Sequence, residues 1–76
     1  MYQICFSINL GPNKSIRPVL VGLETMIKAR EYLDQLRGGS FDGRSYDCQD
    51  YLNHYSTTDG KYSMFIQKEP ENAGNE

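Results

Sequence analysis

Three residues of this chain have side chains suited to nucleophilic or metal chemistry: Cys5, Cys48 and His54. A nucleophilic enzyme needs a base beside its nucleophile and a further group that orients the base. His54 is the only histidine, and the sequence offers no third group to orient it. Structural zinc sites usually show short paired spacings such as C-x₂-C, which this sequence lacks. We therefore predict no catalytic residue, no metal site, no cofactor and no enzymatic activity.

Glycine-rich segments cradle phosphate groups only where they lead into the N-terminus of a helix. Here Gly38, Gly39 and Gly43 follow the predicted helix instead of preceding it. They lie at its C-terminal end, where the helix dipole is negative. The sequence therefore argues against a nucleotide site.

Aromatic side chains are the strongest indication of a binding surface. The chain has six tyrosines and three phenylalanines but no tryptophan. Protein interfaces are enriched in Tyr, Phe, Met and Arg. We predict a partner-binding surface made by one face of a C-terminal hairpin and the loop before it. Its members are Tyr51, Asn53, Tyr55 and Phe65 on the hairpin, and Phe41, Arg44 and Tyr46 in the loop.

Single-stranded nucleic acid suits the same aromatic face less well. Aromatic side chains on a sheet can stack on bases, but neutralised phosphates supply most of the affinity. The formal net charge is −2, and residues 41–76 carry seven acidic against three basic residues. The sequence also has no RNP1-like run of basic, glycine and aromatic residues. A sheet-based single-stranded nucleic-acid-binding protein is therefore the alternative hypothesis.

No motif identifies a family for this chain. In size and style it resembles the small single-domain proteins of phages and other mobile elements, including anti-CRISPR inhibitors. That resemblance implies an inhibitor that blocks a surface of a larger host complex. Our leading hypothesis is a non-catalytic protein-binding module, with the partner's identity and the oligomeric state left open.

The elements that must position these residues begin with two strands. Apolar and polar side chains alternate from residue 2 to residue 10, a pattern typical of a half-buried strand. Residues 11–14 are predicted to be a turn, followed by a second strand over residues 15–23. The expected register pairs Leu10 with Ser15, Phe6 with Val19, Ile4 with Val21 and Tyr2 with Leu23. Pro18 cannot donate to a ladder, so the second strand should lie at an edge or contain a bulge.

A helix is predicted over residues 25–37, with Thr25 as its N-cap and Gly38 as the residue that ends it. Its apolar stripe has helical spacing and comprises Met26, Ala29, Leu33 and Leu36. Residues 38–47, rich in Gly, Ser and Asp, are predicted to be a long, mobile loop.

The last ordered unit is predicted to be a hairpin. A three-residue turn over 58–60 would pair Ser56 with Tyr62, His54 with Met64 and Leu52 with Ile66. This register would place Tyr51, Tyr55 and Phe65 on the face that the helix leaves free. A competing interpretation makes residues 48–55 a short helix with Asp47 as N-cap. The favoured fold is an α+β domain in ββαββ order, with one helix packed on one face of an antiparallel sheet.

The chain is expected to form a single domain over residues 1–69, followed by a disordered acidic tail over residues 70–76. Its longest apolar run, residues 19–21, is far shorter than the roughly 20 residues that cross a bilayer. The N-terminus does not resemble a signal peptide. Two distant cysteines indicate reduced thiols. We therefore expect a soluble, cytoplasmic protein that does not contact a membrane.

Overall fold

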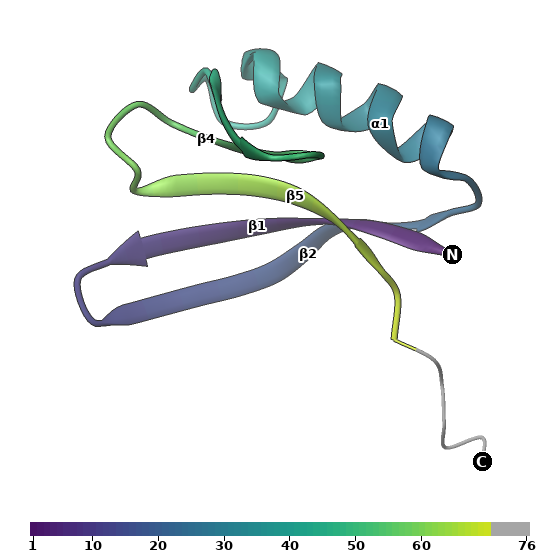
Figure 1. Cartoon of the computed structure of the whole chain (residues 1–76), viewed down its shortest axis with the longest axis horizontal. Coiled ribbons are helices and arrows are strands. Elements are labelled where there is room, and N and C mark those ends of the chain that lie inside the picture. The colour runs from purple at the N-terminus through teal and green to yellow at the C-terminus, as the bar shows by residue number, and fades with distance from the viewer. Residues whose placement is uncertain (71–76) are drawn as a thin grey trace.

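Five strands form one antiparallel sheet in the computed structural model, which describes residues 1–70. In spatial order they are β2 (Asn13–Leu23), β1 (Tyr2–Leu10), β5 (Tyr62–Lys68), β4 (His54–Ser56) and β3 (Cys48–Tyr51). The helix α1 (Met26–Gln35) packs on one face of this sheet and continues into a π-helical turn, η1 (Leu36–Ser40) (Figure 1). The predicted α+β class is confirmed, but the order is ββαβββ rather than ββαββ.

The additional strand arises within residues 48–56, which were expected to form one strand. A turn at Leu52 and Asn53 splits this segment into β3 and β4, with Tyr51 paired to His54. Asn53 has a backbone φ of 62°, a left-handed conformation that asparagine adopts more readily than most residues. The single strand is therefore corrected to a hairpin, and the competing helix over residues 48–55 is wrong.

The strand β1 forms as predicted, and Ile4 and Phe6 are buried in the core beneath α1. The expectation of a half-buried strand is wrong, because Gln3, Cys5 and Ser7 on its other face are buried as well. The turn that follows is shorter than expected, because Gly11 and Pro12 alone connect Leu10 to its partner in β2. Gly11 has a φ of 64°, and a glycine in this position is typical of tight hairpin turns.

The short turn changes the register of β2. The pairs Leu10–Asn13 and Phe6–Arg17 replace those predicted, whereas Tyr2 still pairs with Leu23. Two irregularities between Tyr2 and Cys5 absorb the difference of two residues. As predicted from Pro18, β2 lies at an edge of the sheet and its pairing is irregular.

The helix begins as predicted, since the Thr25 hydroxyl accepts a hydrogen bond from the Lys28 amide at 3.1 Å. Ala29 and Leu33 are fully buried against the sheet. The α-helix ends two residues earlier than expected, at Gln35, and the chain leaves through η1. The left-handed glycine there is Gly39, with a φ of 114°, and not the predicted Gly38.

The β4–β5 register differs from the prediction by one residue. Thr57 bonds to Tyr62 across a four-residue connection, over 58–61, instead of the expected three-residue turn. The Asp59 carboxylate stabilises the longer loop by accepting hydrogen bonds from the Thr57 hydroxyl at 2.6 Å and the Lys61 amide at 2.9 Å. A one-residue shift turns every side chain of a strand to the other face. Tyr55 consequently pairs with Met64 in the core.

The segment from residue 41 to residue 47 packs against the core instead of forming the expected mobile loop. Tyr46 is fully buried, and the Phe41 ring lies 5.1 Å from that of Phe6. Within residues 1–70, no helix combines the length and apolar character needed to cross a membrane. The predicted disordered tail lies outside the described residues, except for Pro70.

Candidate protein-binding surface

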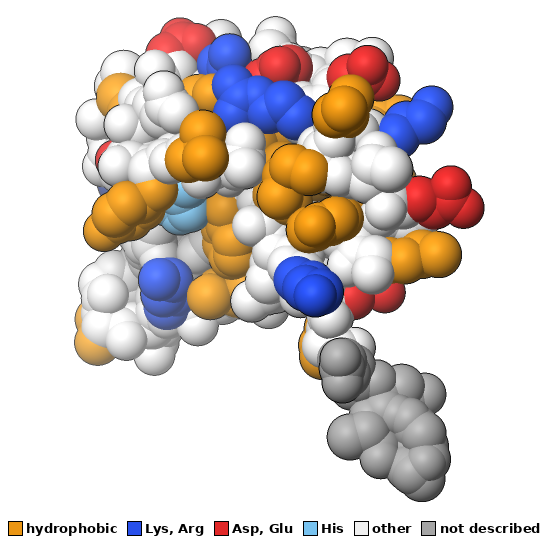
Figure 2. Space-filling view, turned by 45° about the vertical axis from the view of Figure 1, so that its right-hand side comes forward, with side chains coloured by type: hydrophobic (Ala, Val, Ile, Leu, Met, Phe, Trp, Pro, Cys, Tyr) orange, Lys and Arg blue, Asp and Glu red, His pale blue; other side chains and the backbone are white. Residues whose placement is uncertain are grey.

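The most exposed large apolar side chains meet where the first turn of α1 approaches the β3–β4 turn. Ile27 is 74% exposed and Leu52 is 80% exposed. Together they border an open groove of about 470 Å³. We call this the apolar groove; its lining residues are Met26, Ile27, Arg30, Glu31, Leu52 and Asn53. Hydrophobic side chains gather on the side of the molecule turned forward in Figure 2, with basic side chains above and below them.

Asn53 joins the two walls of the groove. Its Oδ1 accepts a hydrogen bond from the Arg30 guanidinium at 2.9 Å, and its Nδ2 approaches the Met26 Sδ at 3.5 Å. Its backbone carbonyl accepts a hydrogen bond from the Ile66 amide at 3.0 Å. The β3–β4 turn is therefore held against both α1 and β5, and Leu52 is presented on a supported turn.

Arg30 lines the groove, but its guanidinium is held by contacts within the fold. Its Nε lies 3.4 Å from the Asp34 carboxylate, and its guanidinium donates a hydrogen bond to the Tyr55 hydroxyl. The Tyr55 ring also contacts the Arg37 guanidinium, 4.1 Å from the ring centroid. By contrast, the exposed Glu31 forms no salt bridge among the described residues. The Asp34 carboxylate is shared, since it also pairs with Arg37 at 3.1 Å. Glu31 is therefore the groove's charged side chain that no salt bridge engages within residues 1–70.

The sheet face opposite α1, which we call the uncovered face, carries a row of aromatic rings. The centroids of His54 and Phe65 are 5.3 Å apart, and those of Tyr51 and His54 are 5.6 Å apart. Tyr51 is 73% exposed, and Phe65 is half-buried. Tyr51 and Phe65 therefore lie on this face, with His54 between them instead of Tyr55. Their role as contact residues stays a prediction.

His54 has polar neighbours, but they are not arranged for nucleophilic catalysis. Its Nδ1 lies 3.4 Å from the Asp50 carboxylate, a distance and geometry that give an ion pair with protonated imidazole but no hydrogen bond. Ser56 donates its hydroxyl proton to Asp50 at 3.0 Å and not to His54. The His54 imidazole is therefore not positioned to activate this hydroxyl.

Two of the predicted contact residues are core residues. Tyr55 is 4% exposed and Tyr46 is fully buried, so neither presents its ring to a partner. Tyr55 changes face because of the β4–β5 register. Tyr46 is drawn inward because its ring completes the core while its hydroxyl reaches Asp42 at 2.6 Å.

The other predicted loop residues are held in place. Phe41 is half-buried against Phe6. Arg44 stays exposed, but its guanidinium stacks 4.0 Å from the Tyr62 ring centroid and bonds to Asp42 at 2.9 Å. Asn53, predicted on a strand face, instead occupies the turn beside the groove. The predicted site residues are thus divided among the groove, the uncovered face and the core.

The contact between Tyr46 and Asp42 alters the acidity of both groups. Burial and the hydrogen bond to Asp42 raise the pKa of Tyr46 far above its ordinary value. Burial tends to raise the pKa of Asp42, but hydrogen bonds from Tyr46 and Arg44 outweigh it and hold that pKa below its ordinary value. This buried hydroxyl and its carboxylate therefore fix the loop and do not form a reactive pair.

The sequence interpretation missed the two most exposed groove residues. Ile27 lies directly beside Met26 and falls outside the apolar stripe of the helix, so its exposure could have been anticipated. Leu52 was placed on the buried face of a strand, and no local pattern indicated that a turn would expose it. Only the packing of α1 beside the β3–β4 turn brings residues 27 and 52 together.

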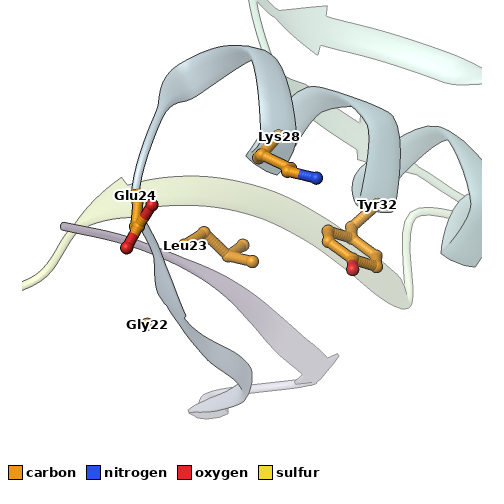
Figure 3. Close-up of a pocket in the computed structure, with 5 residues that line it drawn as sticks. All are labelled: Gly22, Leu23, Glu24, Lys28 and Tyr32. Carbon is orange, nitrogen blue, oxygen red and sulfur yellow. The ribbon is translucent and has the colours of Figure 1, made fainter.

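A second, smaller hollow lies between the end of β2 and the first two turns of α1 (Figure 3). Its walls are formed by Gly22, Leu23, Glu24, Lys28 and Tyr32, and its volume is about 200 Å³. Small-molecule sites typically occupy roughly 300–1,000 Å³. Among residues 1–70, no three His, Cys, Asp or Glu side chains gather as they would around a metal ion.

Comparisons with protein-family models, with curated proteins and with solved structures gave no match for this chain.

Proposed function

We propose that this chain is a non-catalytic protein-binding module whose main contact surface is the apolar groove. The proposal rests on one observation: Ile27 and Leu52, 74% and 80% exposed, border one groove although they lie 25 positions apart in the sequence. Exposed apolar side chains scattered singly are ordinary, whereas a group of them commonly marks a contact site. The contacts of Asn53 with Arg30 and Met26 hold the β3–β4 turn beside α1, so the groove is formed before a partner binds.

The openness of the groove favours a protein partner over a small molecule. Small-molecule sites usually bury most of the ligand surface, whereas the groove's apolar walls remain largely exposed. The Glu31 carboxylate in its lining, which forms no salt bridge among the described residues, favours a partner that places a basic residue beside its apolar anchor. In this proposal the chain is a cytoplasmic inhibitor that uses the groove to cover a surface of a larger complex.

Replacing Ile27 and Leu52 by alanine tests the proposal directly. Both side chains are exposed, so the substitutions should change the melting temperature little. A partner captured by the unaltered protein should bind at least about tenfold more weakly to each variant, as expected when an anchor is truncated. Val21→Ala is the matched control, because Val21 is 58% exposed but lies outside the groove. Equal losses in all three variants would contradict a groove-specific contact.

The aromatic row of the uncovered face favours single-stranded nucleic acid as the second candidate. Tyr51 and Phe65 flank His54, with ring centroids 5.6 and 5.3 Å from that of the imidazole, and bases stack on exposed aromatic rings. Titration of labelled single strands at two salt concentrations separates the candidates. Tight binding that weakens steeply with salt, and that Tyr51→Ala reduces while Ile27→Ala does not, would favour nucleic acid over the protein partner.

A further inference from the structure

The edge strand β2 offers a binding surface separate from the apolar groove. It is 11 residues long and has only β1 as a neighbour in the sheet. From Asn13 to Pro18 its pairing with β1 is regular, and all these residues are exposed. Figure 1 shows β2 running along the outer side of β1, away from α1. An edge of this kind can accept a further strand.

The pairing of β1 with its two neighbours determines which backbone groups of β2 face outward along this edge. The Asn9 amide donates to Lys61 at the β5 side of the sheet, so Asn9 and its partner Lys14 do not bond to each other. Backbone groups of successive residues point to opposite edges of an antiparallel strand. Lys14 and Ile16 therefore direct both their N–H and C=O groups away from β1, while Ser15 and Arg17 bond to β1.

Charge distinguishes the possible occupants of the edge. Lys14 and Arg17 are exposed, and neither belongs to a salt bridge among residues 1–70. The strand β2 contains no acidic residue. A second copy pairing through the same edge would bring four cations together with no compensating carboxylate, which disfavours self-association. A strand carrying acidic residues would instead pair with both cations.

An acidic side chain already satisfies a backbone group near the end of β2. The Gly22 amide donates to Glu69 Oε2 at 2.6 Å, where the pairing of β2 with β1 becomes irregular. The regular segment, residues 13–18, has no corresponding acid in the described residues. We propose that this segment of β2 binds an extended acidic peptide segment of a partner protein as an added strand.

The test uses the full chain and a blocked peptide of about six residues, a typical strand length. The peptide consists of threonine and valine with two glutamates spaced as Lys14 and Arg17 are; a matched peptide carries lysines instead. The acidic peptide should slow amide hydrogen exchange at Lys14 and Ile16 and change Ser15 and Arg17 little. Ile27→Ala and Leu52→Ala should leave this effect intact, which separates the inference from the proposed function.

Two variants distinguish the charge from the backbone contribution. Reversal of both charges, K14E with R17E, should transfer the preference to the lysine peptide. Ile16→Pro removes one outward N–H while both cations remain, and should weaken the acidic peptide at least about tenfold. The charge reversal keeps the test decisive if proline disturbs the strand. Unchanged exchange with the acidic peptide, equal binding of both peptides, or protection that depends on protein concentration alone would overturn the proposal.

Discussion

At the scale of single residues, the hydrogen bond from the fully buried Tyr46 to Asp42 holds the segment that follows η1. Arg44 bonds to the same carboxylate and stacks on Tyr62. These contacts convert a segment rich in Gly, Ser and Asp into an ordered part of the core wall. Six tyrosines suggested an interface, but the burial of Tyr46 and Tyr55 shows that some of them complete a small core.

We expect Tyr46→Phe to lower the free energy of unfolding by about 1.5–3 kcal/mol at neutral pH, because a hydrogen bond to a charged group is lost. The folded-state pKa of Asp42 lies below its ordinary value. Its stabilisation is therefore complete above the ordinary carboxyl pKa of about 4 and is lost as the pH falls through the lower, folded-state pKa. Urea unfolding at neutral and acidic pH should show the difference between the proteins shrinking in acid; a difference independent of pH would contradict this role.

At the scale of elements, the β3–β4 turn decides what the groove presents. Its Asn53 has a positive φ and bonds to both Arg30 and Met26. The backbone conformation and the side-chain contacts of Asn53 therefore both contribute to holding Leu52 beside α1. Substitutions that retain one contribution and remove the other can separate them.

We expect Asn53→Ala to destabilise the domain more than Asn53→Gly, by about 1 kcal/mol. Both variants lose the side-chain contacts, but glycine adopts a positive φ without the steric cost that alanine meets. Chemical denaturation measures the difference. Equal destabilisation would show that the side-chain contacts, rather than the turn conformation, dominate at this position.

At the scale of the whole molecule, the sheet separates the two cysteines. Cys5 lies on β1 and Cys48 on β3, with β5 and β4 between them. Three strand spacings amount to roughly 14 Å, whereas a disulfide needs Cα atoms within about 7 Å. Both cysteines are free, and burial raises the pKa of Cys5, so its thiolate is disfavoured.

This arrangement predicts that neither a reductant nor a metal chelator changes the melting temperature of the purified protein. No disulfide within the chain is available to reduce, and the Cys5 thiol contacts Gln67 at 3.5 Å. Thermal unfolding followed by circular dichroism, with and without each reagent, provides the measurement. A drop of several degrees with the chelator would mean that Cys48 or His54 takes part in a metal site.

The sequence alone determined those features of the fold that depend on residues close together in the chain. The nine-residue strand β1, the Thr25 cap and the edge position implied by Pro18 are all found in the structure. Long patterns constrain a strand's face, because many side chains would have to move together to reverse it. The α+β class followed from these elements.

Tertiary structure decided the face of β4 and the position of the groove. The strand β4 has only three residues, so its face depends on the length of the loop that follows it. One extra loop residue, stabilised by Asp59, turns Tyr55 into the core and His54 to the opposite face of the sheet. The groove joins Ile27 to Leu52 across different elements, and no periodicity links residues so far apart in the chain. Local sequence determines the apolar pattern of each helix or strand. Loop length and packing determine which of these elements meet, because contacts between residues distant in sequence form only when the chain closes on itself.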